Sequence, residues 1–144
     1  MLSNSSKYAV NAVIYLAVHS SENNKVSAKE IAEKLNIPLP FLAKLLQTLA
    51  RKRAISSVKG PGGGFWLTDK EKQAPLMTII ELVDDTQTFS TCSMSLKGCS
   101  ETKPCPVHYV VKPFKNELKR QLEENSISFF AEKISSGEAF LFIT

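Results

Sequence analysis

The sequence predicts a mainly α-helical fold, a winged helix-turn-helix with a two-stranded β wing and a long C-terminal dimerisation helix. Three patterns predict this fold. Two short amphipathic stretches flank a tight turn within residues 27–51, a glycine-rich turn separates two strand-like stretches within residues 55–68, and a helical apolar stripe runs from residue 106 to about residue 124. With 144 residues, of which 43% are hydrophobic, the chain is long enough for one domain with a core.

The first helix is expected over residues 5–20. Tyr8 to Val18 is apolar apart from Asn11, so we expect this helix to be buried on several sides. The stretch has no basic leader or cleavage motif and is shorter than the ~20 residues that a membrane span needs. We therefore expect a cytoplasmic protein without membrane contact. An odd number of cysteines, three, fits such a reducing compartment.

The helix-turn-helix is expected to begin at Ser27. Ser27 and Glu30 have the spacing of a capping box, in which the hydroxyl accepts a backbone N–H and the carboxylate reaches back. The apolar positions that follow have helical spacing and are Ala28, Ile31, Ala32 and Leu35. Asn36-Ile37-Pro38 should end this helix, because asparagine tolerates a left-handed turn and proline cannot continue a helix.

A second helix is expected to begin near Pro40, since a first turn does not need the missing N–H. Its apolar stripe consists of Leu42, Leu45, Leu46 and Leu49. Its opposite face carries Ala43, Lys44, Gln47, Thr48 and Arg51. Small, polar and basic side chains on the outer face are typical of a recognition helix that enters the major groove of DNA.

The stretches 55–58 and 65–68 are expected to be strands, separated by Lys59-Gly60-Pro61-Gly62-Gly63-Gly64. A basic, glycine-rich hairpin tip after a recognition helix is expected to lie along the phosphates or in the minor groove. Residues 25–59 carry eight basic and two acidic side chains, so their net charge is +6. The whole chain is +4, which leaves −2 for the remainder. This is the charge distribution expected of a DNA-binding protein.

The rest of the chain divides into a connector, two helical regions and a long loop. Residues 69–74 should be a charged connector, and residues 75–85 a helix with Leu76, Ile79, Ile80 and Val83 on one face. Residues 86–104 show no period. From 106 to about 124 a helix is expected, kinked or delayed by Pro113, and its apolar stripe favours dimerisation over packing within the subunit. A docking helix should follow near 127–134, and the apolar residues 139–143 should be covered or frayed.

The long loop contains the chemistry. Cys92, Cys99 and Cys105 follow the spacing C-x6-C-x5-C, and His108 completes C-x2-H. Thiolates and an imidazole can hold zinc or an iron–sulfur cluster. The absence of close cysteine pairs favours a cluster, while three unligated thiols and a redox switch made from two of them stay open as alternatives. The predicted divisions are residues 1–85 (winged helix), 86–105 (cysteine loop) and 106–144 (dimerisation helix and tail).

On the wing Ser56–Phe65 and the three-cysteine loop, the chain resembles the Rrf2 family of bacterial transcriptional regulators, in particular its iron–sulfur, IscR-like branch. The resemblance implies a homodimeric repressor or activator with a 2Fe-2S cluster on Cys92, Cys99, Cys105 and His108. It favours His108 as fourth ligand because Tyr8 stands where some relatives have a carboxylate ligand. Arg53 replaces the glycine that usually ends the recognition helix, so that turn should carry a conformational cost.

The sequence therefore predicts a sequence-specific, DNA-binding transcriptional regulator, controlled by an iron–sulfur cluster whose ligation orders residues 86–108 and positions the long helix. The alternative is the same module with a zinc-stabilised or thiol-based redox sensor. No enzyme activity or small-molecule substrate is expected, because no acid–base pair or nucleotide loop is present in the sequence. The candidate contacts to a double-stranded operator are Ser27, Pro40, Ala43, Lys44, Gln47, Thr48, Arg51, Lys59, Gly60, Gly62 and Gly63.

Overall fold

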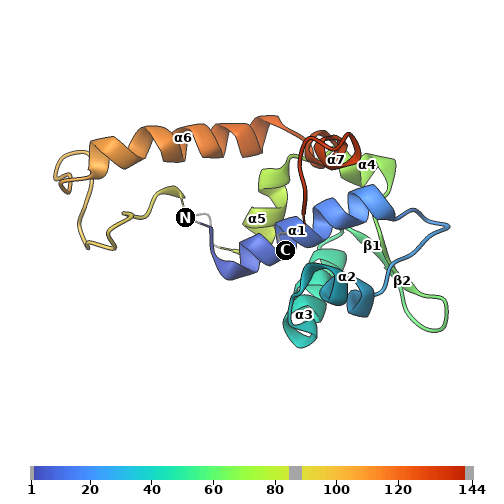
Figure 1. Ribbon diagram of the computed structural model, residues 1–144. Coiled ribbons are helices and arrows are strands. Elements are labelled where there is room, and N and C mark those ends of the chain that lie inside the picture. The colour runs from blue at the N-terminus through green and yellow to red at the C-terminus, as the bar shows by residue number, and fades with distance from the viewer. Residues whose placement is uncertain (1, 85–88, 142–144) are drawn as a thin grey trace.

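A computed structural model describes residues 2–84 and 89–141 of the chain. The elements, in order, are α1 (Asn4–His19), α2 (Ala28–Leu35), α3 (Leu39–Arg51), β1 (Ser56–Val58), β2 (Gly64–Trp66), α4 (Asp69–Lys72), α5 (Leu76–Val83), α6 (His108–Glu124) and α7 (Ile127–Ser135). Figure 1 shows α1–α5, the wing and α7 gathered in one body, from which α6 carries the preceding loop away. The expected winged-helix fold is confirmed.

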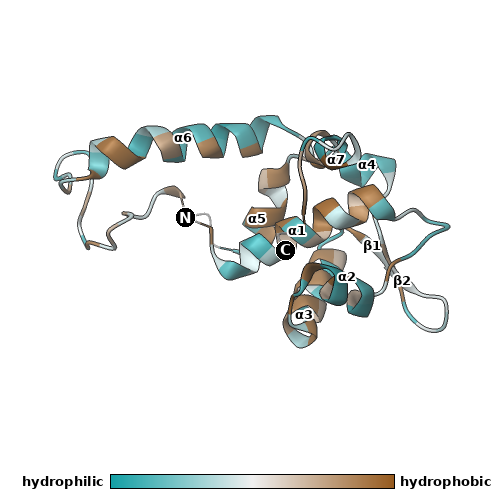
Figure 2. Ribbon diagram, in the orientation of Figure 1, coloured by the Kyte–Doolittle hydropathy of each residue, from teal (hydrophilic) through white to brown (hydrophobic). Residues whose placement is uncertain are grey.

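Helix α1 lies at the centre of this body. It packs against α7, α5 and α3, and Ala9, Ala12 and Leu16 are fully buried. Figure 2 shows hydrophobic residues along α1 and on the faces of the helices around it. The expectation that α1 is buried on several sides is confirmed. None of the helices in the described part of the chain is long and apolar enough to cross a membrane.

Helices α2 and α3 form the predicted helix-turn-helix. The Ser27 hydroxyl caps α2 by accepting the Glu30 N–H at 3.1 Å. The Glu30 carboxylate, which we expected to reach back to Ser27, instead accepts a hydrogen bond from the Tyr15 hydroxyl at 3.5 Å. Asn36 adopts the predicted left-handed conformation, with φ 52°. Arg53 does so after α3, with φ 60°, which costs about 1–2 kcal/mol for a residue with a side chain.

The wing is an antiparallel pair in which Ser56 faces Trp66 and Val58 faces Gly64. A third segment joins it, which the sequence patterns did not reveal. Val26 and Phe65 exchange both backbone hydrogen bonds, at 2.9 and 2.8 Å. The start of α2 is thereby fixed to the root of the wing.

Residues 69–72 form a short helix, α4, rather than the charged connector we expected. Thr68 and Glu71 make a complete capping box, with the two backbone-to-side-chain hydrogen bonds at 2.9 and 3.1 Å. The Glu71 carboxylate also accepts the Ser56 hydroxyl at 2.9 Å. The missed signal was the Thr-x-x-Glu spacing, which is that of a helix start.

The predictions for α5 and α7 are confirmed. Leu76, Ile79 and Ile80 are buried beneath α1. Backbone hydrogen bonds join the start of α5 to the start of α7, from Ile127 N–H to the Ala74 carbonyl at 2.9 Å. In the apolar C-terminal stretch Phe140 is exposed, whereas residues 142 and 143 lie outside the described residues.

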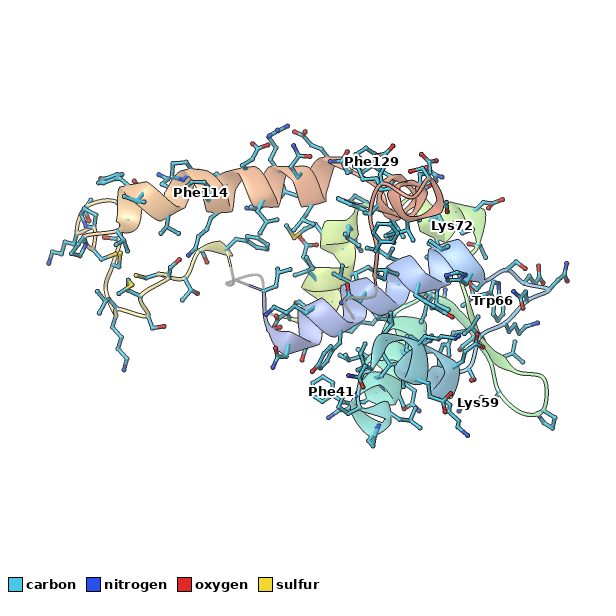
Figure 3. All side chains as sticks on the ribbon, in the orientation of Figure 1. Phe41, Lys59, Trp66, Lys72, Phe114 and Phe129 are labelled. Atoms are coloured by element: carbon cyan, nitrogen blue, oxygen red, sulfur yellow. The ribbon has the colours of Figure 1, made fainter. Side chains whose placement is uncertain are left out.

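Helix α6 begins at His108, so Pro113 lies inside the helix and does not delay its start. The apolar stripe has two parts with different surroundings. Leu122 is buried and Leu118 partly buried against the body, while Val110 and Phe114 are 65% and 69% exposed. Figure 3 shows Phe114 on the part of α6 that extends away from the body. Half of the stripe thus has no cover within the described part of the subunit.

Candidate nucleic-acid interface and metal centre

The outer face of α3 presents the predicted contact residues to solvent. Lys44, Gln47 and Arg51 are exposed, Pro40 is exposed in the first turn, and Ala43 is partly buried. The Thr48 hydroxyl donates to the Lys44 carbonyl at 3.0 Å, so its hydrogen is used inside the helix. Ser27 is exposed beside α3, with its oxygen engaged as the cap of α2.

The wing tip adds a second basic contact surface. Lys59 is exposed and extends into solvent from the hairpin end (Figure 3). Gly60 and Gly62 have φ values of +91° and +74°, a conformation that favours glycine. A Cβ atom on Gly63 would lie 2.2 Å from the Val58 carbonyl oxygen, so this position excludes any side chain. The backbone of the tip is therefore free to approach another molecule closely.

Two apolar side chains beside these residues were not among the predicted contacts. Leu39 and Phe41, in the first turn of α3, are 40% and 43% exposed. The Phe41 ring packs edge-on against Tyr8, with ring centroids 5.5 Å apart. The Leu-Pro-Phe run at the predicted helix start could have indicated this exposed position.

The three cysteines converge in the loop before α6. Their sulfur atoms all lie within 4.8 Å of one another, and each cysteine is partly buried. The sulfur atoms of Cys92 and Cys105 are 3.6 Å apart, and the Cys99 sulfur lies 3.4 Å from His108 Nδ1. The four predicted ligands therefore form two close pairs, which spacing alone could not establish.

Local hydrogen bonds act differently on the thiols. Backbone N–H groups of Leu96 and then Met94 stabilise the Cys92 thiolate and lower its pKa to about 7. The Cys105 N–H donates to the Cys99 sulfur at 3.3 Å. That bond favours the Cys99 thiolate, but burial and the two neighbouring thiols outweigh it, so the pKa of Cys99 is raised.

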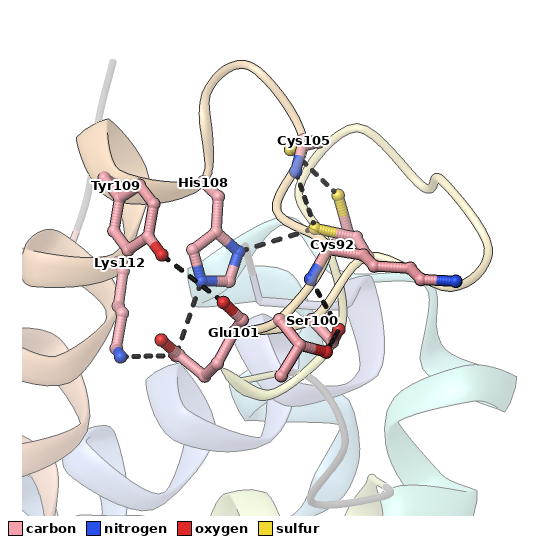
Figure 4. A network of polar contacts seen from close by, with 10 residues as sticks. Cys92, Ser100, Glu101, Cys105, His108, Tyr109 and Lys112 are labelled. Carbon is pink, nitrogen blue, oxygen red and sulfur yellow. Dashed lines mark hydrogen bonds and ion pairs between the residues drawn. The ribbon is translucent and has the colours of Figure 1, made fainter.

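His108, the first residue of α6, is held from its other side by Glu101. The Nε2 atom lies 3.4 Å from the Glu101 carboxylate, which also forms an ion pair with Lys112 (Figure 4). The Tyr109 hydroxyl donates to the Glu101 carbonyl at 3.4 Å. Lys112, and then His108, lower the pKa of Glu101. A proton held on Nε2 leaves Nδ1, which faces the sulfur atoms, with a free lone pair.

The donor set fits a metal centre. A cavity of about 440 Å³ is lined by the three cysteines and His108, together with residues of α6 that include Lys112 and Lys115. Three thiols and an imidazole nitrogen are ligands that zinc and iron–sulfur clusters both accept. Glu101 was not predicted as part of this centre, because a lone acidic residue in a polar loop gives no spacing signal.

Comparison with known proteins supplies a family. Residues 2–133 match the model of Rrf2, described as an iron-dependent transcriptional regulator. A putative HTH-type transcriptional regulator of Aquifex aeolicus is 35% identical over 121 residues, 83% of each chain. The HTH-type transcriptional regulator IscR of Sodalis glossinidius is 30% identical over 137 residues, covering 95% of this chain and 80% of that one. The structure of T. potens IscR superposes with a TM-score of 0.70 at 23% identity, covering 97% and 92%, which shows a shared fold.

Proposed function

Because the chain belongs to the Rrf2 family of transcriptional regulators, we propose that it is a homodimeric, sequence-specific DNA-binding regulator controlled by an iron–sulfur cluster. The observation that carries the cluster proposal is the meeting of Cys92, Cys99, Cys105 and His108 in two close pairs. Each iron of a two-iron cluster takes two protein ligands, so two pairs are the number such a cluster needs.

The homodimer is supported by the uncovered part of α6. Tyr109, Val110 and Phe114 are 62%, 65% and 69% exposed on this helix. Apolar side chains in such number on one helix are costly to leave in water, and a second copy of the same helix offers the same apolar surface in return. We therefore assign this face to the subunit interface of a twofold dimer.

The DNA contacts follow from the two exposed basic surfaces. Lys44, Gln47 and Arg51 on α3 face a major groove, with Pro40, Ala43 and Thr48 beside them, and Ser27 marks the adjacent start of α2. On the wing, Lys59 approaches the phosphates, and the backbone of Gly60, Gly62 and Gly63 allows close contact. Two copies would address two half-sites about 34 Å apart.

The cysteine loop is directly continuous with α6, and this connection suggests how the cluster controls DNA binding. When bound, the cluster supplies a redox-active centre in this loop. Cys92 would then be joined to His108, the first residue of α6, across the intervening loop. Holding these residues together restrains α6, and so the distance and angle between the two recognition helices of the dimer.

The first test is an anaerobic ultraviolet–visible spectrum of freshly purified protein, with iron and sulfide assays. Two irons and two sulfides per chain, lost in Cys92→Ser and His108→Ala, support the cluster. DNA titrations with and without the cluster then test its control. Identical affinity and sequence preference in both forms would refute the switching proposal and leave DNA binding unaffected.

The second candidate keeps the DNA-binding module and places zinc on the same four residues. The observation in its favour is that the three sulfur atoms lie within 4.8 Å of one another, since a compact S₃N donor set suits one tetrahedral ion. Stoichiometric zinc without sulfide in anaerobically purified protein would support this candidate over the cluster.

A further inference from the structure

The outward side of the first turn of α3 is apolar. We call Leu39, Pro40, Phe41 and Ala43 the apolar tip of the recognition helix. Leu39, Pro40 and Phe41 are exposed, and Ala43 is partly buried. Helical geometry places Pro40 and Ala43 on the same outward line as Gln47, with Leu39 and Phe41 on the two flanks. Lys44 is the first residue of α3 whose side chain can form a hydrogen bond.

The protein core does not account for these side chains. The core side of α3 is formed by Leu42, Leu46 and Leu49, which are fully buried. Phe41 touches Tyr8 with one edge, which orients the ring but leaves much of it in solvent. Figure 3 shows Phe41 at the outer edge of α3, away from the centre of the body.

The surroundings of the tip indicate its partner. Lys44 and Arg51 follow it along the same helix, and the segment from residue 25 to residue 59 carries a net charge of +6. A positive surface with a small apolar centre matches the major groove of DNA, in which negative phosphates border base edges. The one apolar group on those edges is the C5-methyl group of thymine.

We propose that the apolar tip packs against thymine methyl groups, so that each operator half-site carries thymine beneath the first turn of α3. This inference rests on the proposed DNA-binding function and adds the chemistry of the half-site. Gln47, one turn further along, is placed to hydrogen-bond a neighbouring base, for which adenine is the preferred partner of an amide. The apolar tip and Gln47 would together favour A·T pairs at adjacent positions.

The test begins with selection from a random duplex library, followed by replacement of single thymines by deoxyuridine in the enriched sequence. Deoxyuridine pairs as thymine does but lacks the methyl group. Removing a buried methyl group should weaken binding about fourfold at each half-site, or about fifteenfold when both are changed. Equal affinity for the thymine and deoxyuridine duplexes at every position would overturn the inference.

Variants locate the effect on the protein. In the double variant Leu39→Ala/Phe41→Ala, the loss on deoxyuridine substitution should fall to about twofold or less. The matched control is Lys59→Ala, which should weaken binding to all duplexes but keep the full deoxyuridine effect. A deoxyuridine effect that persists in the tip variant would refute the assignment to these side chains.

The outcome also separates this inference from the function on which it rests. Salt-dependent duplex binding without a deoxyuridine effect would refute only the role of the apolar tip. A folded protein, checked by circular dichroism, that binds none of the library duplexes would refute the DNA-binding proposal, and this inference with it.

Discussion

Replacing Gly63 by alanine should damage the wing without damaging the core. A Cβ atom at this position would lie 2.2 Å from the Val58 carbonyl oxygen and 2.8 Å from the Gly60 carbonyl oxygen. Both oxygens belong to the backbone, so no side-chain rotation can relieve the contact. The hairpin has to open, and the Gly63 N–H to Gly60 hydrogen bond of 2.9 Å is lost.

The expected cost in stability is small. Loss of one turn hydrogen bond costs about 0.5–1.5 kcal/mol. The root of the wing stays held by the two Val26–Phe65 hydrogen bonds. For a domain of this size 1 kcal/mol lowers the melting temperature by about 2–4 °C. DNA binding should suffer more, because the displaced tip carries Lys59 away from the phosphates and the salt slope should fall by about one for each lysine lost.

The matched control is Gly62→Ala. A Cβ atom at Gly62 would meet nothing within 4 Å among the described residues, although its φ of +74° costs a side chain about 1–2 kcal/mol. Fluorescence anisotropy against salt concentration, together with thermal melting, measures both effects. Similar melting temperatures with a reduced salt slope in Gly63→Ala alone are expected. Equal slopes in the two variants would refute the argument from the shape of the wing.

Further predictions concern the recognition helix, the dimer and the metal centre. Gln47→Ala should relax the preference at one base pair in a selection experiment, whereas a uniform loss of affinity would place Gln47 on the backbone. Phe114→Glu should convert the dimer to a monomer in analytical ultracentrifugation, because the charge would lie in the apolar interface, while Lys119→Glu on the polar side should not. Glu101→Ala should free the His108 ring from its restraint and reduce cluster retention by about 10–100-fold, as the loss of outer-shell partners does at other metal sites. Glu123→Ala is the matched control for that measurement, and equal retention in both variants would show that Glu101 does not position the ring.

Short-range features of the fold could be predicted because they depend on neighbours in the sequence. The Ser27 cap, the left-handed turn at Asn36 and the buried leucines of α3 all follow from spacing within one or two helical turns. The α4 helix was missed although its Thr68–Glu71 pair carries the same kind of signal. The sequence therefore determined the helix-turn-helix, the wing and the cysteine-bearing loop.

The tertiary structure decided which of these local features meet. The pairing of Cys92 with Cys105, and of Cys99 with His108, depends on how the loop folds back, which spacing does not specify. The contact of Glu101 with His108 has the same origin. The uncovered half of the α6 stripe appears only once the body has enclosed the other half. Each of these results comes from the closure of loops between residues distant in sequence, where the free energy depends on the whole packed molecule rather than on a local pattern.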